Sequence, residues 1–143
     1  MTQENKELLV KDLCARLPYG VCCKHTIWDE ELGEVEVVVK IYSVNHDGYV
    51  RNCCDDEIVY IDTVKPYLFP LSSMTKEQQK EANIFDDMDI DILSENLDRN
   101  RRNKTNIPTP TFNYTDWLNK NHFDYRGLIE KGLAIDATGL NIY

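Results

Sequence analysis

Two short runs of cysteine and histidine are the first residues whose types suggest chemistry. Thiolate and imidazole groups are the ligands that zinc prefers, arranged as a tetrahedron. Adjacent residues of a strand point to opposite faces, and the C-x2-C spacing of a zinc ribbon is absent. We therefore predict no metal site and no cofactor, with the thiols as small core hydrophobes and the histidines on the surface. The residues concerned are Cys22, Cys23, His25, His46, Cys53 and Cys54.

A second candidate for metal chemistry is the alternation of carboxylates in Asp87-Met88-Asp89-Ile90-Asp91. A calcium-binding loop of this kind needs glycine at its sixth position and a bidentate glutamate at its twelfth. The chain has Ile92 and Asp98 at those positions. This run is therefore predicted to be a solvated acidic segment without calcium.

The chain contains none of the motifs that are typical of common enzyme families, such as a glycine-rich phosphate loop, a nucleophile elbow or an H-E-x-x-H helix. A cysteine could still meet His122 in space, so an unrecognised metal-dependent or hydrolytic enzyme stays as the weakest alternative. We predict that the protein is not an enzyme.

Aromatic and charged side chains gather in ten residues near the C-terminus. Tryptophan, tyrosine and arginine are the usual anchors of protein interfaces. Aromatic residues at helical spacing also commonly dock a helix onto its own core, and that alternative stays open. The candidate partner-binding surface consists of Trp117, His122, Phe123, Asp124, Tyr125 and Arg126.

The net charge of −9 limits the classes of partner. An acidic chain repels nucleic-acid phosphates overall, and only the basic run 99–104, with four basic and no acidic residues, argues otherwise. Eight acids in residues 75–98 lie next to that run and are expected to attract it. The partner is therefore predicted to be another protein, with nucleic acid disfavoured and the oligomeric state undetermined.

The first residues are polar and charged, unlike a signal peptide, and no stretch has the ~20 apolar residues that a membrane span needs. The five cysteines are an odd number, and a disulfide framework is not expected in a reducing compartment. We predict a cytoplasmic protein that has no contact with membranes.

The hydrophobic pattern predicts a mixed α+β fold in one domain. Leu9, Leu13 and Leu17 form an apolar stripe on a helix over residues 3–17, with Thr2 as its N-cap and Pro18 at its end. Short strands follow, and Asp47-Gly48 marks a tight hairpin. One helical turn before the fifth strand suggests a small five-stranded antiparallel, SH3-like barrel. The predicted strands cover residues 21–28, 35–44, 49–54, 58–61 and 68–73.

The rest of the chain is predicted to be helical around a long connector. Thr75 and Gln78 form a capping box for a helix to about Ala82, which closes a first segment of residues 1–82. Residues 83–113 are polar and charged and are expected to be a flexible connector. Residues 114–143 are predicted to form a helical hairpin packed on the barrel, with Asp124 capping its second helix and Gly132 ending it.

Three separate runs agree in order and spacing with one family. They are residues 1–20, the run Val64-Lys65-Pro66-Tyr67-Leu68-Phe69-Pro70-Leu71-Ser72-Ser73-Met74-Thr75, and residues 116–134. Together they resemble small uncharacterised proteins of gut Bacteroides-type bacteria and their phages or prophages. The resemblance is weakest over residues 83–112, and the paired cysteines do not belong to the family pattern. It implies a bacterial or phage setting and an accessory role, and it carries over no catalytic residue.

Two classes of function follow. The first is a non-enzymatic interaction or accessory protein of a bacterium or phage, acting in the bacterial host cell. The second is a nucleic-acid-associated small barrel, whose binding would weaken strongly with salt because phosphate contacts release counterions.

Overall fold

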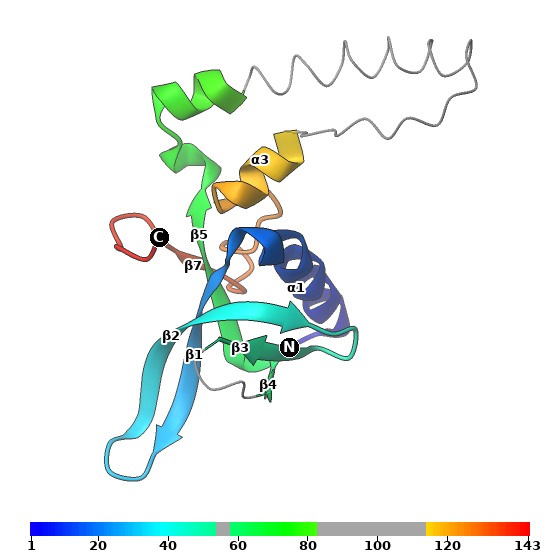
Figure 1. Cartoon of the computed structure of the whole chain (residues 1–143), viewed down its shortest axis with the longest axis vertical. Helices are drawn as coiled ribbons and strands as arrows, with labels where there is room; N and C mark the ends of the chain where they lie inside the picture. Colours follow the sequence, from blue (N-terminus) through cyan, green and yellow to red (C-terminus); the bar gives the residue numbers. More distant parts are fainter. Residues whose placement is uncertain (54–57, 83–113) are drawn as a thin grey trace, which may run out of the picture.

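A computed structural model describes residues 1–53, 58–82 and 114–143 of the chain. It is mixed α+β, as predicted, with one long N-terminal helix beside an open sheet (Figure 1). None of the helices in these three ranges has the length and apolar character to span a bilayer. The connector 83–113, with the acidic run 87–91 and the basic run 99–104, lies outside the described residues, as does Cys54.

The N-terminal helix α1 spans Gln3–Arg16 and confirms the predicted element. The Thr2 hydroxyl accepts a hydrogen bond from the Asn5 amide at 3.2 Å and caps its first turn. Leu9 and Leu13 are fully buried on one side of the helix. Pro18 begins a 3-10 turn, Leu17–Tyr19, that ends the helix.

Four strands form an antiparallel meander. Val39 and Ile41 are buried on the predicted apolar face of β2. Gly48 has φ +84° in the turn after β2, a conformation that favours glycine. The Asn45 side chain accepts hydrogen bonds from the amides of Asp47 and Tyr49, which tightens the same turn. The four strands are β1 (Cys22–Asp29), β2 (Gly33–Val44), β3 (Tyr49–Asn52) and β4 (Ile58–Tyr60).

A 3-10 turn, Ile61–Thr63, leads into β5, Val64–Pro70. The order of turn and strand is as predicted, but the strand begins four residues before the predicted range 68–73, and residues 71–73 form a 3-10 turn. The strand β5 lies antiparallel to β1, and its second half pairs in parallel with two short C-terminal strands, β6 (Phe123–Asp124) and β7 (Ile135–Asp136). The path through the sheet is β4-β3-β2-β1-β5-β6. Within the described residues no pairing joins β4 back to β5, so the sheet is open and barrel closure is not observed.

The C-terminal segment differs from the predicted helical hairpin. One helix, α3, spans Tyr114–Lys120, but turns and two short strands follow it in place of a second helix. Gly127 and Gly132 have φ of +69° and +68°, which breaks a right-handed helix in this stretch. Asp124 and Gly132, which were predicted to begin and end a second helix, lie in a compact loop instead. Residues 76–82 are helical after the 3-10 turn Leu71–Ser73, as the capping box predicted.

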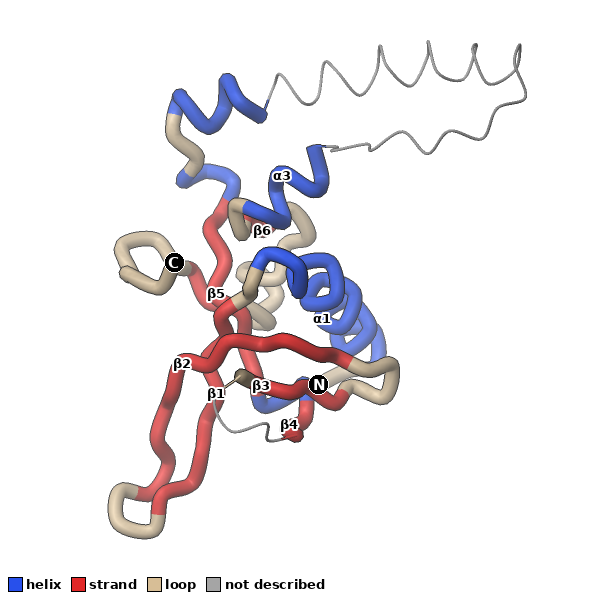
Figure 2. The backbone as a smooth tube through the Cα atoms, viewed as in Figure 1, coloured by secondary structure: helices blue, strands red, loops and turns tan. Residues whose placement is uncertain are grey.

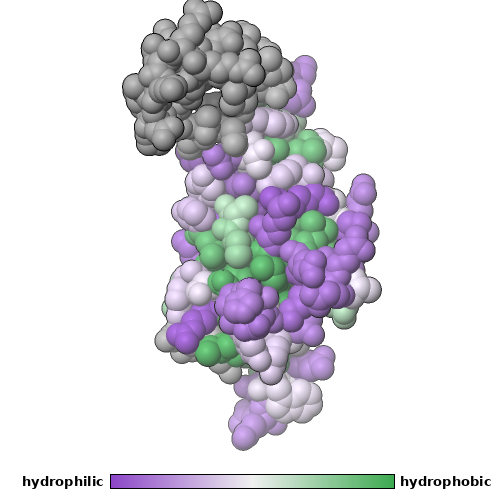
Figure 3. Space-filling view, turned by 90° about the vertical axis from the view of Figure 1, so that its right-hand side faces the viewer, coloured by the Kyte–Doolittle hydropathy of each residue, from purple (hydrophilic) through white to green (hydrophobic). Residues whose placement is uncertain are grey.

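Two apolar clusters hold these elements together. The larger joins Leu9 and Leu13 of α1 to the inner face of the sheet and to Leu128 and Leu133 of the C-terminal loop. The smaller surrounds Trp117. Residues far apart in sequence therefore share one core, and the C-terminal segment runs beside β5 (Figure 2). The face on the α1 side is mostly hydrophilic, with hydrophobic areas that include a large one near its centre (Figure 3).

Candidate functional site

The aromatic residues of the predicted partner surface lie mainly inside the protein. Trp117 and Phe123 are each 2% exposed, and their rings stack 5.6 Å apart. Their position matches the alternative in which these aromatics dock the tail onto its own core. Of the six predicted residues, only Tyr125 and Arg126 are more than marginally accessible.

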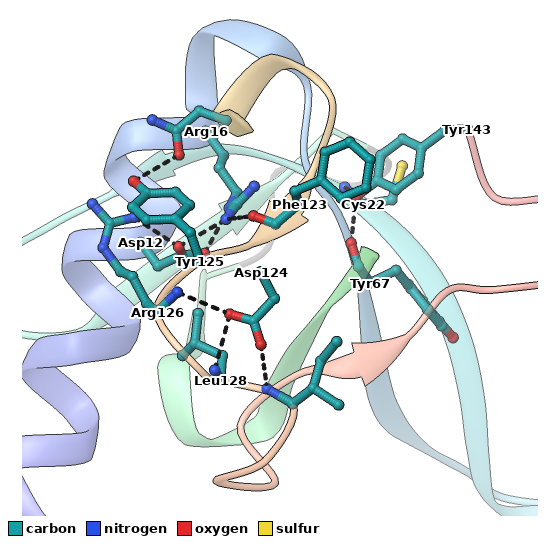
Figure 4. Close-up of polar contacts among 12 residues, drawn as sticks. Asp12, Arg16, Cys22, Tyr67, Phe123, Asp124, Tyr125, Arg126, Leu128 and Tyr143 are labelled. Carbon is teal, nitrogen blue, oxygen red and sulfur yellow. Dashed lines mark hydrogen bonds and ion pairs between the residues drawn. The ribbon is translucent and has the colours of Figure 1, made fainter. Parts of the chain in front are cut away.

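Charged groups from α1 and the C-terminal loop meet beneath this tail (Figure 4). The Asp12 carboxylate accepts hydrogen bonds from Arg16 Nε at 2.7 Å and from Arg126 Nη1 at 2.8 Å. Arg16 Nη2 also donates to the Phe123 carbonyl oxygen at 2.8 Å. Asp12 and Arg16 are fully buried, so their charges are compensated by these protein groups and not by water. We call Asp12, Arg16 and Arg126 the buried charge network.

Asp124 organises the loop that carries Arg126. Its two carboxylate oxygens accept hydrogen bonds from the amides of Leu128, at 3.0 Å, and Ile129, at 2.8 Å. The Arg126 guanidinium also lies over the Tyr125 ring, 4.3 Å from its centre. Asp124, Tyr125 and Arg126 therefore stabilise the tail on α1 and are already engaged with other parts of this chain.

The remaining predicted residue, His122, lines an open cavity of about 490 Å³ together with Phe123. The cavity lies between the end of β5, the start of the 76–82 helix, the turn from α3 to β6 and the C-terminus. Its apolar wall includes Phe69 and Tyr143, and its polar rim includes Gln78 and Thr138. We call this space the His122 cleft. Among the positions of the six predicted surface residues, this cleft is the one with the shape of a binding site.

His122 is held in an unusual state. It has φ +57°, is 6% exposed, and its ring stacks 3.8 Å from the Tyr143 ring. Its Nδ1 atom is buried and has no hydrogen-bond partner in the part of the chain that the structure describes. Burial, with a smaller contribution from the positive charges of Arg16 and Lys40, lowers the pKa of His122 to about 4. The imidazole is therefore neutral at pH 7, with one nitrogen unsatisfied.

Tyr143 packs directly against this ring. Its hydroxyl donates to the Tyr67 carbonyl oxygen at 2.8 Å and accepts from the Cys22 amide at 3.3 Å. Burial raises the pKa of Tyr143 well above its ordinary value. The phenol is thus a fixed, neutral surface that closes one side of the His122 cleft.

Three of the described thiols are less acidic than a free cysteine. Burial raises the pKa of Cys14, Cys22 and Cys23, so each stays protonated at neutral pH, and a thiol is a poor nucleophile. Over residues 1–53, 58–82 and 114–143, no three histidine, cysteine, aspartate or glutamate side chains are grouped to hold a metal ion.

Sequence reasoning missed several residues of this region. Asp12 and Arg16 are four positions apart on α1, a spacing that favours an ion pair and that was visible in the sequence. Phe69 and Tyr143 reach the cleft only because β5 pairs with the C-terminal strands, and no local pattern reports that pairing. Comparison of the chain with protein-family models, with curated proteins and with solved structures gave no match.

His122 should make stability depend on pH. Because its folded pKa of about 4 lies below the ordinary value of 6.5, the neutral ring stabilises the fold fully above pH 6.5. That contribution should be lost as the pH falls towards 4, by up to about 3 kcal/mol. Urea unfolding at a series of pH values measures the effect. In His122→Gln this part of the pH dependence should disappear; an unchanged profile would mean that His122 is solvated when folded.

Proposed function

We propose that the protein is a non-enzymatic interaction protein and that the His122 cleft receives an apolar or aromatic side chain of a partner protein. The observation that carries the proposal is an open cavity whose lining brings together the rings of Phe69, His122 and Tyr143. Beside it lies the buried Nδ1 of His122, which has no hydrogen-bond partner among the described residues. Leaving such a nitrogen unsatisfied costs about 1–3 kcal/mol, which a ligand with one hydrogen-bonding group would offset.

The chemistry of the walls supports this occupant. Phe69, Phe123 and Tyr143 offer aromatic surface, and a neutral imidazole can donate or accept one hydrogen bond. A cavity of this size suits one large side chain or small molecule. Tryptophan and tyrosine combine an aromatic body with one polar group, so they match both parts of the cleft.

A small barrel that binds nucleic acid is the second candidate. The strand order β4-β3-β2-β1-β5, with a 3-10 turn before β5, is compatible with an SH3-like arrangement. The net charge of −9 opposes contact with phosphates, so protein binding is preferred. The resemblance to proteins of Bacteroides-type bacteria and their phages supports an accessory role in the cytoplasm of a bacterial host.

Indole and 4-methylphenol are suitable probes of the His122 cleft. Ligands of this size bind with dissociation constants in about the millimolar range. Titration into the labelled chain should shift the amide resonances of Phe69, His122 and Gly139 in a saturable way, followed by two-dimensional NMR. Toluene lacks a hydrogen-bonding group and serves as the matched control, and it should bind more weakly.

His122→Phe keeps an aromatic ring and removes both nitrogens. This variant should lose the preference for indole over toluene while still binding each. Saturable shifts that map elsewhere, or an unchanged preference in the variant, would contradict the proposed role of His122.

A further inference from the structure

The hairpin of β1 and β2 extends beyond the rest of the sheet (Figure 1). Along β1, residues 23–25 pair with β5, but residues 26–29 pair only with β2. The reason is the 3-10 turn Ile61–Thr63, which takes the chain away from β1 just before β5 begins. The outer half of β1 is therefore an edge strand in the part of the chain that the structure describes.

The hydrogen-bond alternation shows which backbone groups face this edge. The Ile41 amide donates to the Val21 carbonyl oxygen at 3.0 Å, so odd-numbered residues of β1 direct their backbone groups towards β2. Consistently, the Cys22 amide points the other way, to the Tyr143 hydroxyl. Thr26 and Trp28 therefore direct their backbone groups to the side opposite β2. The Thr26 amide there faces the Thr63 carbonyl, where the pairing of β1 with β5 ends at His25 and Val64. The Thr26 carbonyl and the amide and carbonyl of Trp28 face the edge. Among the described residues, no strand pairs with Trp28 there.

This edge opens onto a groove of about 570 Å³ between β1 and β4. Residues 25–28 form one wall, and Val59, Tyr60 and Thr63 form the other. Apolar groups stay accessible along it: Trp28 is 75% exposed and Tyr60 is 58% exposed. The far wall also ends in an edge, because β4 pairs only with β3 in the described ranges. Both walls of the groove therefore end in strand edges in the described ranges.

The negative charge of the β1–β2 hairpin determines which kind of partner segment this edge attracts. Residues 26–38 contain five acidic and no basic residues. The lower end of the molecule in Figure 3, which the hairpin forms, is mainly hydrophilic. A second copy of this chain, or a nucleic acid, would bring like charge against this edge, whereas a basic segment would be attracted.

We propose that an extended, basic segment of a partner protein adds as a strand to β1 at Thr26–Trp28. Its backbone pairs with the edge, alternate apolar side chains enter the groove beside Trp28 and Tyr60, and its lysine or arginine side chains lie near the acids of the hairpin. This surface shares no residue with the His122 cleft, so it is an interaction site in addition to the one proposed above.

The probe is the peptide acetyl-Lys-Ile-Lys-Val-Lys-Ile-Lys-amide, titrated into the labelled full chain. The amides of Thr26, Trp28 and Tyr60 should shift, and that of Trp28 should gain protection from hydrogen exchange. Binding should weaken as salt rises. A peptide with glutamate in place of lysine should not bind. Methylating the lysine amide nitrogens in one peptide and the isoleucine and valine amide nitrogens in another should weaken one far more than the other, because only one set faces β1.

Two variants of one exposed position test the edge on the protein side. Trp28→Val and Trp28→Pro both remove the indole, but only proline removes the amide that faces the groove. The peptide should bind Trp28→Pro about tenfold more weakly than Trp28→Val, equivalent to about one hydrogen bond. If Trp28→Pro fails to fold, the two methylated peptides still decide the question with the unaltered chain.

Four results would overturn the inference: equal binding of the two methylated peptides, equal binding of the glutamate peptide, shifts that map to Phe69 and Gly139, or self-association of the chain through Thr26 and Trp28. The third would place the peptide in the His122 cleft and would leave the function proposed for that cleft standing. Conversely, failure of indole to bind would contradict the function proposed for the His122 cleft and would leave the inference about the edge of β1 standing.

Discussion

Replacing Asp12 with alanine should lower the free energy of unfolding by about 3–5 kcal/mol. The variant leaves Arg16 fully buried without its carboxylate, and it removes the anchor of Arg126 on α1. Removing one partner of a buried ion pair is costly because the remaining charge stays away from water. Urea denaturation at pH 7, followed by circular dichroism, measures the change.

Lys11→Ala is the matched control, because this exposed neighbour on α1 should change stability by no more than about 0.5 kcal/mol. A triple variant with Asp12→Leu, Arg16→Met and Arg126→Met removes every charge and should recover much of the loss. If Asp12→Ala costs no more than Lys11→Ala, the buried charge network does not hold the C-terminal loop on α1.

Trp117→Ala should cost about 3–5 kcal/mol, because the ring is 2% exposed and stacks on Phe123 in the smaller apolar cluster. Trp117→Phe should cost less, since a phenyl ring can keep part of the stacking. The indole nitrogen of Trp117 has no hydrogen-bond partner within residues 1–53, 58–82 and 114–143, so removing this nitrogen adds no further cost. Both variants are compared by the midpoint and slope of urea unfolding.

The chain supplies a matched control of the same residue type. Trp28 is 75% exposed on the β1–β2 hairpin, and Trp28→Ala should change stability by about 0.5 kcal/mol or less. Equal effects at Trp28 and Trp117 would show that the tail does not depend on its tryptophan for packing. That result would support the interpretation of Trp117 as an exposed binding residue.

Local signals in the sequence accounted for the elements they could specify. The leucine spacing and the Thr2 cap placed α1, the valine alternation placed the buried face of β2, and Asp47-Gly48 placed its turn. The 3-10 turn before β5 was also visible. Each of these depends on residues within a few positions of one another, so pattern and propensity suffice.

The wrong prediction of a C-terminal helical hairpin also arose from local patterns. Asp124 and Gly132 were interpreted as the start and end of a helix, because a carboxylate that caps a helix and one that closes a loop have the same local signature. The structure shows Asp124 accepting from Leu128 and Ile129 in a loop that Gly127 interrupts. Residues close in sequence could not distinguish a helix cap from the closure of a loop.

By itself the sequence determined the mixed composition of the fold, the first helix, the early strands, the acidic character, and which residues carried aromatic or ionisable groups. Tertiary structure decided which of those groups meet. It joined Asp12 to Arg126 across 114 positions, placed Tyr143 against His122, and stopped β5 before the outer half of β1. These outcomes depend on the pairing of distant strands and on burial. Such contacts arise from the global packing of the chain, and no local run of residues encodes them.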